Sequence, residues 1–509
     1  MEAQLIMKQE TGFGSKAGFI FAAVGSAIGL GNIWRFPAVA YENGGGAFFI
    51  PYLIALLTTG LGFLILEFSL GNKFRGSSPL VFFRINKKFE MYGWFPVFIT
   101  FIISTYYTII LAYSINYLVS SFTSGWGDDT EAYFFNNVLH VSEDPATFGH
   151  FVPGILIPVL LIWLVVLTIL FRGVKKGIEA FNKIMIPVLI IMFSMIVIRA
   201  VTLPGALTGL DALFTPDWSS IMKPSVWVAA YGQIFFSLSL AMGIMITYSS
   251  YMPKKSELSN SALITGFANS SFELLAGIGV FSALGFMANN LEVPISEVSS
   301  AGIGLAFVVF PEILSTMPAS QFFSVLFFGS LTIAGLTSLV SVLEVPISAL
   351  IDKFNLSRRK AIAFVSIPSM ILSSGYTMQN GIHILDVVDY FINNIAIVTS
   401  ALLLILITLF ITRQGKHIIE FVNLHSYIKI GTKWFISLAV VTPILLCYMF
   451  INSLYTIITD GYGGFKTSFL LTYGWSVIAF LFIGSIVISQ LKWHKDVTLQ
   501  NTENQREVI

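Results

Sequence analysis

The sequence contains few charged residues. Asp, Glu, Lys and Arg make up only 11% of its 509 residues, whereas a typical soluble domain contains about 25%. The 28 basic and 27 acidic residues leave a net charge of +1, so the basic face that a nucleic-acid partner requires is not expected. The one cysteine, Cys447, has no second cysteine to pair with, which excludes a fold held by internal disulfides.

The sequence also lacks the patterns of catalytic sites. It has no Walker motif, and its apolar segments carry no nucleophile–base or metal-ligating constellation. An enzyme is therefore not expected. The six histidines are expected in loops and tails rather than in the apolar segments: His140, His150, His383, His417, His425 and His494.

Long apolar runs dominate what is present. Hydrophobic residues make up 55% of the chain, and the mean hydropathy is +0.81. A helix needs about 20 apolar residues to cross a bilayer, so we predict an all-α polytopic membrane protein. No cleavable signal is expected, because the stretch after the polar residues 1–15 is too long for a signal core. Twelve membrane helices are predicted, near 16–40, 46–71, 92–120, 152–171, 181–202, 224–250, 260–287, 321–350, 361–378, 388–412, 434–457 and 469–490.

The loops predict how the chain is oriented. Loops after odd-numbered helices are acidic or neutral, as in residues 128–144. The positive-inside rule then places both termini in the cytoplasm of a multi-pass protein of the plasma or inner membrane. The basic loops follow even-numbered helices and contain Lys73, Arg75, Arg84, Lys87, Lys88, Arg172, Lys175, Lys176, Lys254, Lys255, Arg358, Arg359, Lys360, Arg413 and Lys416.

The first apolar segment is interrupted near its middle by Gly25-Ser-Ala-Ile-Gly-Leu-Gly-Asn-Ile-Trp-Arg-Phe-Pro37. Each glycine costs a helix interior about 1 kcal/mol relative to alanine, and a charge such as Arg35 at membrane depth costs roughly 2.5 kcal/mol or more. Backbone that leaves the helix inside a membrane must line a cavity or be buried in protein. We therefore predict a broken helix that binds a ligand near the bilayer midplane.

A second interruption, Gly232-Gln-Ile-Phe-Phe-Ser-Leu-Ser-Leu-Ala-Met-Gly243, lies in the sixth segment. Two interrupted helices five segments apart are typical of inverted-repeat transporters. The alternative is that these small residues only let helices pack closely. Asn269 and Glu273 lie one helical turn apart in the seventh segment and share a face.

These motifs resemble those of the neurotransmitter:sodium symporters, most closely the bacterial amino-acid members such as the leucine transporter. The resemblance rests on residues 25–37, 42–52, 232–243, 267–273 and 334–338, and extends over all twelve predicted helices. It implies two inverted five-helix repeats with broken helices 1 and 6, followed by helices 11 and 12. The corresponding boundaries are 1–202, 203–412 and 413–491, with a cytoplasmic tail at 492–509.

The resemblance also implies two sites for sodium ions. Their ligands would be carbonyl, hydroxyl and amide oxygens, which suit a hard cation, and the second set carries no carboxylate, which favours a monovalent ion. The first set is Ala27, Asn32, Ser237 and Asn269, together with the substrate carboxylate. The second set is Gly25, Ile28, Ala334, Thr337 and Ser338.

The implied substrate is an amino acid. Monoamine-carrying relatives have an aspartate where this chain has Gly29, so the substrate is expected to bring its own carboxylate to Leu30, Gly31 and Tyr107. The implied function is sodium-coupled import of a hydrophobic or aromatic amino acid by alternating access, with two sodium ions per substrate. Alternatives are a betaine or γ-amino acid transporter, or an amino-acid sensor that does not transport. The rest of the implied lining is Ile103, Phe236, Ser239, Met242, Ser338 and Val342.

Glu273 occupies the position where chloride-dependent relatives have a small hydroxyl residue, so the resemblance implies chloride independence.

The implied outer gate contains Arg35, Asp389 and Gln233, and the implied inner gate contains Asp352 and Tyr251. The arginine that usually completes the inner gate is absent. Its position holds Glu10, and Lys8 is the expected substitute.

Overall fold

The computed structural model describes residues 12–142, 144–253, 255–298 and 302–494. These residues fold into helices without a named strand, and they form only two isolated bridges, Gly45–Pro216 and Phe151–Met378. This outcome follows from the composition, because a helix satisfies every backbone group within its own segment and can therefore stand in lipid.

Ten candidate membrane spans occur among the described residues. Nine are single helices of sufficient length and apolarity, and the tenth is a pair bent by 55°, formed by α2 (Lys16–Ala27) and α3 (Leu30–Glu42). The nine single spans are Gly46–Phe74, which contains α4 (Phe49–Ala55) and α5 (Leu61–Phe74); Lys87–Ser120, with α7 (Glu90–Ser120); α9 (Pro153–Phe171); Val174–Val201, with α10 (Ala180–Val201); α14 (Leu258–Leu291); α18 (Ser320–Phe354); Gly381–Ile411, with α20 (Gly381–Phe391) and α21 (Ile397–Ile405); Thr432–Thr459, with α24 (Thr442–Thr459); and Thr467–Gln490, with α26 (Ser476–Gln490).

Helices also occupy the remaining two predicted ranges. The sixth range contains α12 (Pro224–Ser237) and α13 (Ile244–Ser250), each too short to count as a span by itself. The ninth contains α19 (Arg358–Gly375), which opens on three basic residues and carries several serines. These two ranges do not meet the length and apolarity of the other spans, so the count of twelve stays a prediction.

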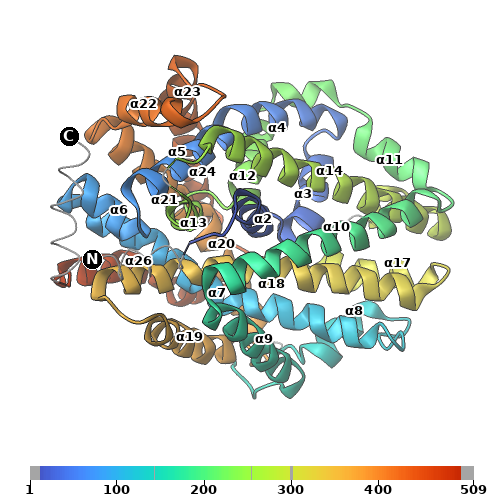
Figure 1. Ribbon diagram of the computed structural model, residues 1–509. Helices are drawn as coiled ribbons and strands as arrows, with labels where there is room; N and C mark the ends of the chain where they lie inside the picture. The colour runs from blue at the N-terminus through green and yellow to red at the C-terminus, as the bar shows by residue number, and fades with distance from the viewer. Residues whose placement is uncertain (1–11, 143, 254, 299–301, 495–509) are drawn as a thin grey trace.

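Hydrogen bonds at the helix ends and in the connections between helices mark two faces of the molecule. On one face, Ser77 N–H reaches Asp352, Arg358 reaches Leu170 O, and Asn72 reaches Pro253 O. We call this the basic-loop face. On the opposite face, the acidic-loop face, the contacts include Tyr117 with Phe307 O, Trp126 with Ser315, and Val152 N–H with Thr377 O. Figure 1 shows α6 (Ser78–Ile85) at one end of the bundle and α11 (Ala206–Phe214) and α17 (Phe310–Thr316) at the other.

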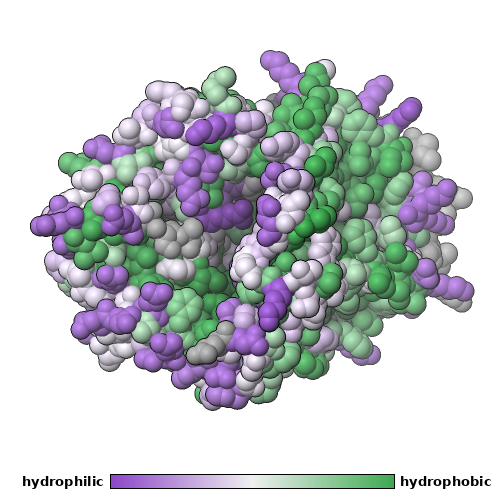
Figure 2. Space-filling model, turned by 180° about the vertical axis from the view of Figure 1, so that it is seen from behind, coloured by the Kyte–Doolittle hydropathy of each residue, from purple (hydrophilic) through white to green (hydrophobic). Residues whose placement is uncertain are grey.

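The broken pair α2–α3 lies inside the bundle. α2 packs against α10, α13, α14 and α18, and α3 packs against α12 and α14 (Figure 1). The outer surface of the bundle is apolar across its middle. Figure 2 shows a broad hydrophobic area there with hydrophilic residues on either side of it, as expected of a surface that contacts lipid.

Candidate binding site at two broken helices

The first break separates α2 from α3 at Ile28 and Gly29, both in extended conformation. The Gly29 N–H donates to Asn32 Oδ1 at 2.9 Å, so the asparagine caps the start of α3. A helix end leaves backbone carbonyls free on one side and N–H groups free on the other, and these attract a cation and an anion respectively. The break therefore provides both kinds of group at the centre of the protein.

The second break covers residues 238–243, between α12 and α13. Ser239, Ala241 and Gly243 all have positive φ, of 52°, 62° and 73°. A left-handed conformation costs a residue other than glycine about 1 kcal/mol or more, and persists only where the surroundings hold it. The break is thus a fixed feature of the fold.

A cavity of about 510 Å³ lies between the two breaks. All ten predicted substrate residues line it, as do Ala27, Asn32, Ser237 and Asp389 from the predicted ion and gate sets. The sequence did not single out several other lining residues, which come from the acidic-loop half of the bundle: Trp34, Ile110, Phe135, Ile303, Ile382, His383, Asp386 and Asn393.

His383 corrects one sequence expectation. It was predicted to lie in a loop, but the structure places it in α20, within the candidate span Gly381–Ile411, and on the wall of the cavity. The reason is that this span begins before the continuous apolar run does, so that its first turn carries polar residues facing the cavity.

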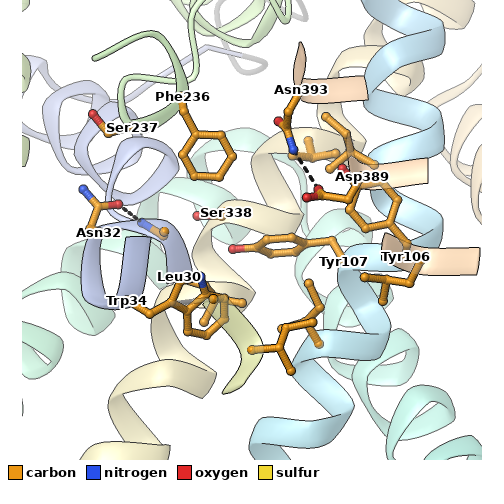
Figure 3. Close-up of a pocket in the computed structure, with 18 of the residues that line it drawn as sticks. Leu30, Asn32, Trp34, Tyr106, Tyr107, Phe236, Ser237, Ser338, Asp389 and Asn393 are labelled. Atoms are coloured by element: carbon orange, nitrogen blue, oxygen red, sulfur yellow. Dashed lines mark hydrogen bonds between the residues drawn. The ribbon is translucent and has the colours of Figure 1, made fainter. Parts of the chain in front are cut away.

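Gly29 brings the backbone close to two hydroxyls on the wall of the cavity. A Cβ at this position would lie 3.1 Å from Ser338 Oγ and 3.3 Å from the Tyr107 hydroxyl oxygen. Figure 3 shows Tyr107 directing its hydroxyl from α7 toward Ser338, beneath the ring of Phe236. The absence of a side chain therefore lets both hydroxyls approach the start of α3, where all three residues line the cavity.

The structure brings three residues of the predicted first sodium set into one hydrogen-bonded group. Asn32 Nδ2 donates to Asn269 Oδ1 at 2.8 Å, and Asn269 Nδ2 donates to Ser237 Oγ at 3.1 Å. The fourth member, Ala27, lines the cavity beside them. This group joins α3, α12 and α14 at the two breaks and offers only neutral oxygen ligands, which suit sodium.

The predicted second sodium set is only partly assembled by direct contacts. Ser338 Oγ lies 3.4 Å from Gly25 O and Ser26 O and 3.5 Å from Ile28 O. These distances exceed the usual 2.5–3.0 Å of a hydroxyl hydrogen bond, so the hydroxyl sits loosely in a cage of carbonyl oxygens. Thr337 instead bonds its own helix, through Ala334 O at 2.9 Å.

Glu273 is fully buried beside this group. Its carboxylate accepts hydrogen bonds from Gln233 Nε2 at 2.6 Å and from the Tyr52 hydroxyl. Across the described residues, no cluster of three or more His, Cys, Asp or Glu side chains could hold a metal ion. Glu273 is therefore a buried carboxyl group held by neutral donors one helical turn from Asn269.

The predicted outer-gate residues do not meet in this conformation. The Arg35 guanidinium lies 4.5 Å from the centre of the Phe236 ring, while Asp389 accepts from Asn393 Nδ2 at 2.8 Å (Figure 3). The cavity reaches Ile303 and Ile382, so it extends toward the acidic-loop face.

The basic-loop side is closed by a network that the sequence only partly indicated. Of the predicted inner-gate residues, Tyr251 donates to Glu344 Oε1 at 2.8 Å, and Asp352 accepts from Ser77 N–H at 2.7 Å. Arg358 pairs with both oxygens of Glu344, at 2.8 and 2.7 Å. The pairing was not foreseen, because it depends on the chain turning back after α18. Lys8 and Glu10 lie outside the described residues.

Glu179 was also missed. Its carboxylate accepts from Gly14 N–H at 2.6 Å, from Ser15 Oγ at 3.1 Å and from Lys183 at 2.5 Å. It thus fixes the start of α2 to the fifth span. A Cβ on Gly18 would lie 2.1 Å from Glu179 Oε1, so a glycine is required for this close approach.

These features define the class of the protein: an α-helical, multi-pass membrane protein whose central cavity lies between two broken helices, an architecture used to bind and move solutes.

Comparison with known proteins makes the assignment specific. The family model of the sodium:neurotransmitter symporter family matches residues 10–130 and 126–495. The chain is 43% identical over 487 residues to a sodium-dependent transporter of Methanocaldococcus jannaschii, with 96% of this chain and 98% of that protein covered. It is 32% identical over 415 residues to the rat sodium- and chloride-dependent GABA transporter 2, with 74% and 69% covered. It is 30% identical over 539 residues to the sodium- and chloride-dependent glycine transporter 2 of Xenopus laevis, with 93% and 68% covered.

The chain belongs to the sodium:neurotransmitter symporter family. It is a sodium-coupled transporter of the membrane and not an enzyme.

Proposed function

We propose that the protein imports a hydrophobic or aromatic amino acid together with two sodium ions. The observation that carries this proposal is the part of the cavity at Gly29, where the hydroxyls of Tyr107 and Ser338 meet the start of α3. A substrate carboxylate fits there, since helix N-termini bind anions. The side chain of the substrate then faces Ile103, Met242 and Val342 on the cavity wall.

The two ions have different relations to the substrate. The first sodium binds among Ala27, Asn32, Ser237 and Asn269 and shares the substrate carboxylate. The second binds at Ser338, between the carbonyls of Gly25 and Ile28, with Ala334 and Thr337 completing its shell. Because ion and substrate share ligands at the first site, each raises the affinity of the other by the same factor.

Transport then follows from alternating access. The basic-loop face is cytoplasmic, with both termini there, and the protein lies in the plasma or inner membrane. Arg35, Gln233 and Asp389 close over the loaded site from outside. The contacts of Tyr251 and Asp352 open afterwards and release the cargo inside. Two inverted repeats, residues 1–202 and 203–412, supply the moving parts, and residues 413–491 add helices 11 and 12.

The proposal includes chloride independence, although two of the relatives are named as chloride-dependent. The buried Glu273 carboxylate already supplies a negative charge next to Asn269 and the first sodium group. A second anion at this place would be repelled and would have to lose its hydration.

Uptake by proteoliposomes tests the proposal. The panel contains labelled L-leucine, L-tryptophan, glycine, GABA and betaine, with sodium or potassium outside and with chloride or gluconate as the anion. Accumulation of leucine or tryptophan that requires sodium and ignores chloride is the expected result. Binding that sodium stimulates without accumulation would instead indicate a sensor.

A γ-amino acid is the second candidate substrate. Such a molecule also carries a carboxylate for the part of the cavity at Gly29, and the rat relative is named as a GABA transporter. The mostly apolar lining favours the hydrophobic amino acid, because a free amine far from the carboxylate would face Ile103, Met242 and Val342. Preferential accumulation of GABA in the panel would reverse this order.

A further inference from the structure

Four serines from three separate segments form a connected group beside the cavity. Ser26 lies in the last turn of α2, Ser239 lies in the second break, and Ser338 and Ser341 lie one turn apart on α18. All four are at least nine-tenths buried. Neither the ion sets nor the substrate set includes Ser26 or Ser341, so their hydroxyls require a separate explanation.

The contacts of the group connect the three segments. Ser341 Oγ donates to Ser26 Oγ at 2.9 Å and also lies 2.7 Å from Ser338 O, so its one proton is shared between an acceptor on α2 and one on its own helix. Ser239 Oγ donates to Ser26 O at 3.1 Å. A continuous chain of hydrogen bonds therefore leads from the second break, through Ser26 and Ser341, to Ser338.

The two ends of this chain lie in different sites. Ser338 is the hydroxyl in the carbonyl cage proposed for the second sodium. Ser239 lines the substrate cavity in a left-handed conformation, with φ of 52°. That strained conformation needs support, and the bond from Ser239 to Ser26 provides it only if the Ser26 carbonyl is held in place.

We propose that Ser26 and Ser341 are positioning residues that transmit occupancy of the second sodium site to the break at Ser239, and so raise the affinity of the cavity for the amino acid. The inference rests on the proposed function and adds to it a route by which the second ion, which does not touch the substrate, favours substrate binding. An ion that draws in the carbonyls around Ser338 fixes Ser26 against α18, and Ser26 then fixes Ser239 at the wall of the cavity.

Ordinary serine packing in a membrane helix looks different. Ser330, also fully buried on α18, bonds Leu326 O one turn earlier at 2.7 Å, which is the usual local arrangement. Ser341 makes such a bond and a second one across to α2. Ser330→Ala is therefore a matched control for Ser341→Ala, because it removes a hydroxyl from the same helix without breaking a contact between helices.

The test measures how strongly sodium raises substrate affinity. Binding of the labelled amino acid that the uptake panel selects is measured on purified full-length protein at low and at saturating sodium, with potassium keeping the ionic strength constant. The ratio of the two dissociation constants is the sodium factor. We expect Ser341→Ala and Ser26→Ala each to lower this factor at least about fivefold, within the usual range of coupling between sites. Ser330→Ala leaves it unchanged.

Two further measurements separate transmission from a general loss of structure. The double variant is expected to show the same fall as either single variant, since both break one chain, and Ser341→Thr, which keeps the hydroxyl, restores the factor. Sodium alone must still raise the melting temperature of both alanine variants, because Ser338 and its carbonyls remain and a bound ion stabilises the folded state.

An unchanged sodium factor in the alanine variants overturns the inference, as does loss of sodium stabilisation, which would make the serines part of the ion site itself. If the wild-type protein binds neither leucine nor tryptophan while sodium still raises its melting temperature, the proposed substrate fails. The sodium factor is then measured with the GABA or betaine of the same panel.

Discussion

Gln233 Nε2 lies 2.6 Å from Glu273 Oε1 and so ties α12, the helix before the second break, to α14. The same carboxylate also accepts from Tyr52 on the second span. The carboxyl group is thus fixed next to the group that we propose for the first sodium, and its removal has a defined consequence for the anion requirement.

Glu273→Ser is expected to make transport depend on chloride. The substitution removes the negative charge that we propose balances the first sodium and leaves a space that a small anion can enter. Uptake by the variant is expected to fall roughly tenfold when gluconate replaces chloride, equivalent to about 1.4 kcal/mol, whereas the wild-type rate stays constant. Glu312→Ser, at a carboxylate on the acidic-loop side, serves as control. A chloride requirement in the wild type would contradict the assignment.

Gly29→Asp is expected to abolish amino-acid uptake. The new side chain starts 3.1 Å from Ser338 Oγ and 3.3 Å from the Tyr107 hydroxyl oxygen, so its carboxylate takes the space proposed for that of the substrate, and two carboxylates there repel each other. Uptake below a tenth of the wild-type rate is expected, with competition by a monoamine such as tryptamine appearing in binding assays.

Gly29→Ala is the control for size alone. Its methyl group makes close contacts without adding a charge, so its loss of uptake is expected to be smaller than that of Gly29→Asp. Equal losses in the two variants would mean that steric exclusion explains the effect, and that the part of the cavity at Gly29 is not specific for a carboxylate.

The contrast between Asn269 and Ser341 shows what the sequence could predict. Asn32, Asn269 and Ser237 lie in unusual polar stretches of otherwise apolar helices, the family resemblance implied that they share one site, and the structure brings them together. A serine such as Ser341 most often bonds its own helix. Its contact with Ser26 depends on how α2 and α18 are aligned, which no local pattern encodes.

Pairs of charged residues show the same limit of prediction from sequence. The sequence places Glu344 inside an apolar segment and Arg358 in a basic loop. Their pairing could not be predicted, because it requires the turn between α18 and α19 to bring the arginine back to the carboxylate. The interruptions at 25–37 and 232–243 were predictable because glycines and polar residues are costly inside a membrane helix. The left-handed conformation of Ser239 was not, since serine has no preference for it.

Glu179→Gln is expected to loosen the start of α2. The carboxylate accepts from Gly14 N–H and from the hydroxyl of Ser15, the residue that caps α2 by accepting from Gly18 N–H at 3.0 Å. Loss of a cap typically costs about 1 kcal/mol, so amide hydrogens of residues 14–27 should exchange roughly fivefold faster if the variant no longer holds Ser15 in place. Lys183→Gln, which removes the charged partner but leaves the contacts with Gly14 and Ser15, is expected to change the exchange much less. Similar exchange in Glu179→Gln and the wild type would rule out this anchoring role.

Lys353 and Glu90 form a buried ion pair that fixes Trp493, which follows α26, to the basic-loop face. The Glu90 carboxylate accepts from Lys353, from Trp94 Nε1 at 3.1 Å and from Trp493 Nε1 at 2.7 Å. The Lys353 ammonium lies 5.2 Å from the centre of the Trp493 ring. Since Lys353 has no solvent exposure, removal of one partner leaves the other charge buried and uncompensated.

Lys353→Met is therefore expected to destabilise the protein by about 3–5 kcal/mol, the usual effect of breaking a buried pair. Lys353→Met combined with Glu90→Leu should recover most of the melting temperature, because no unpaired charge remains and both new side chains are apolar. Thermal unfolding in detergent, followed by tryptophan fluorescence, measures all three proteins. A double variant no more stable than Lys353→Met would mean that the indole contacts of Glu90, and not its charge balance with Lys353, hold Trp493 in place.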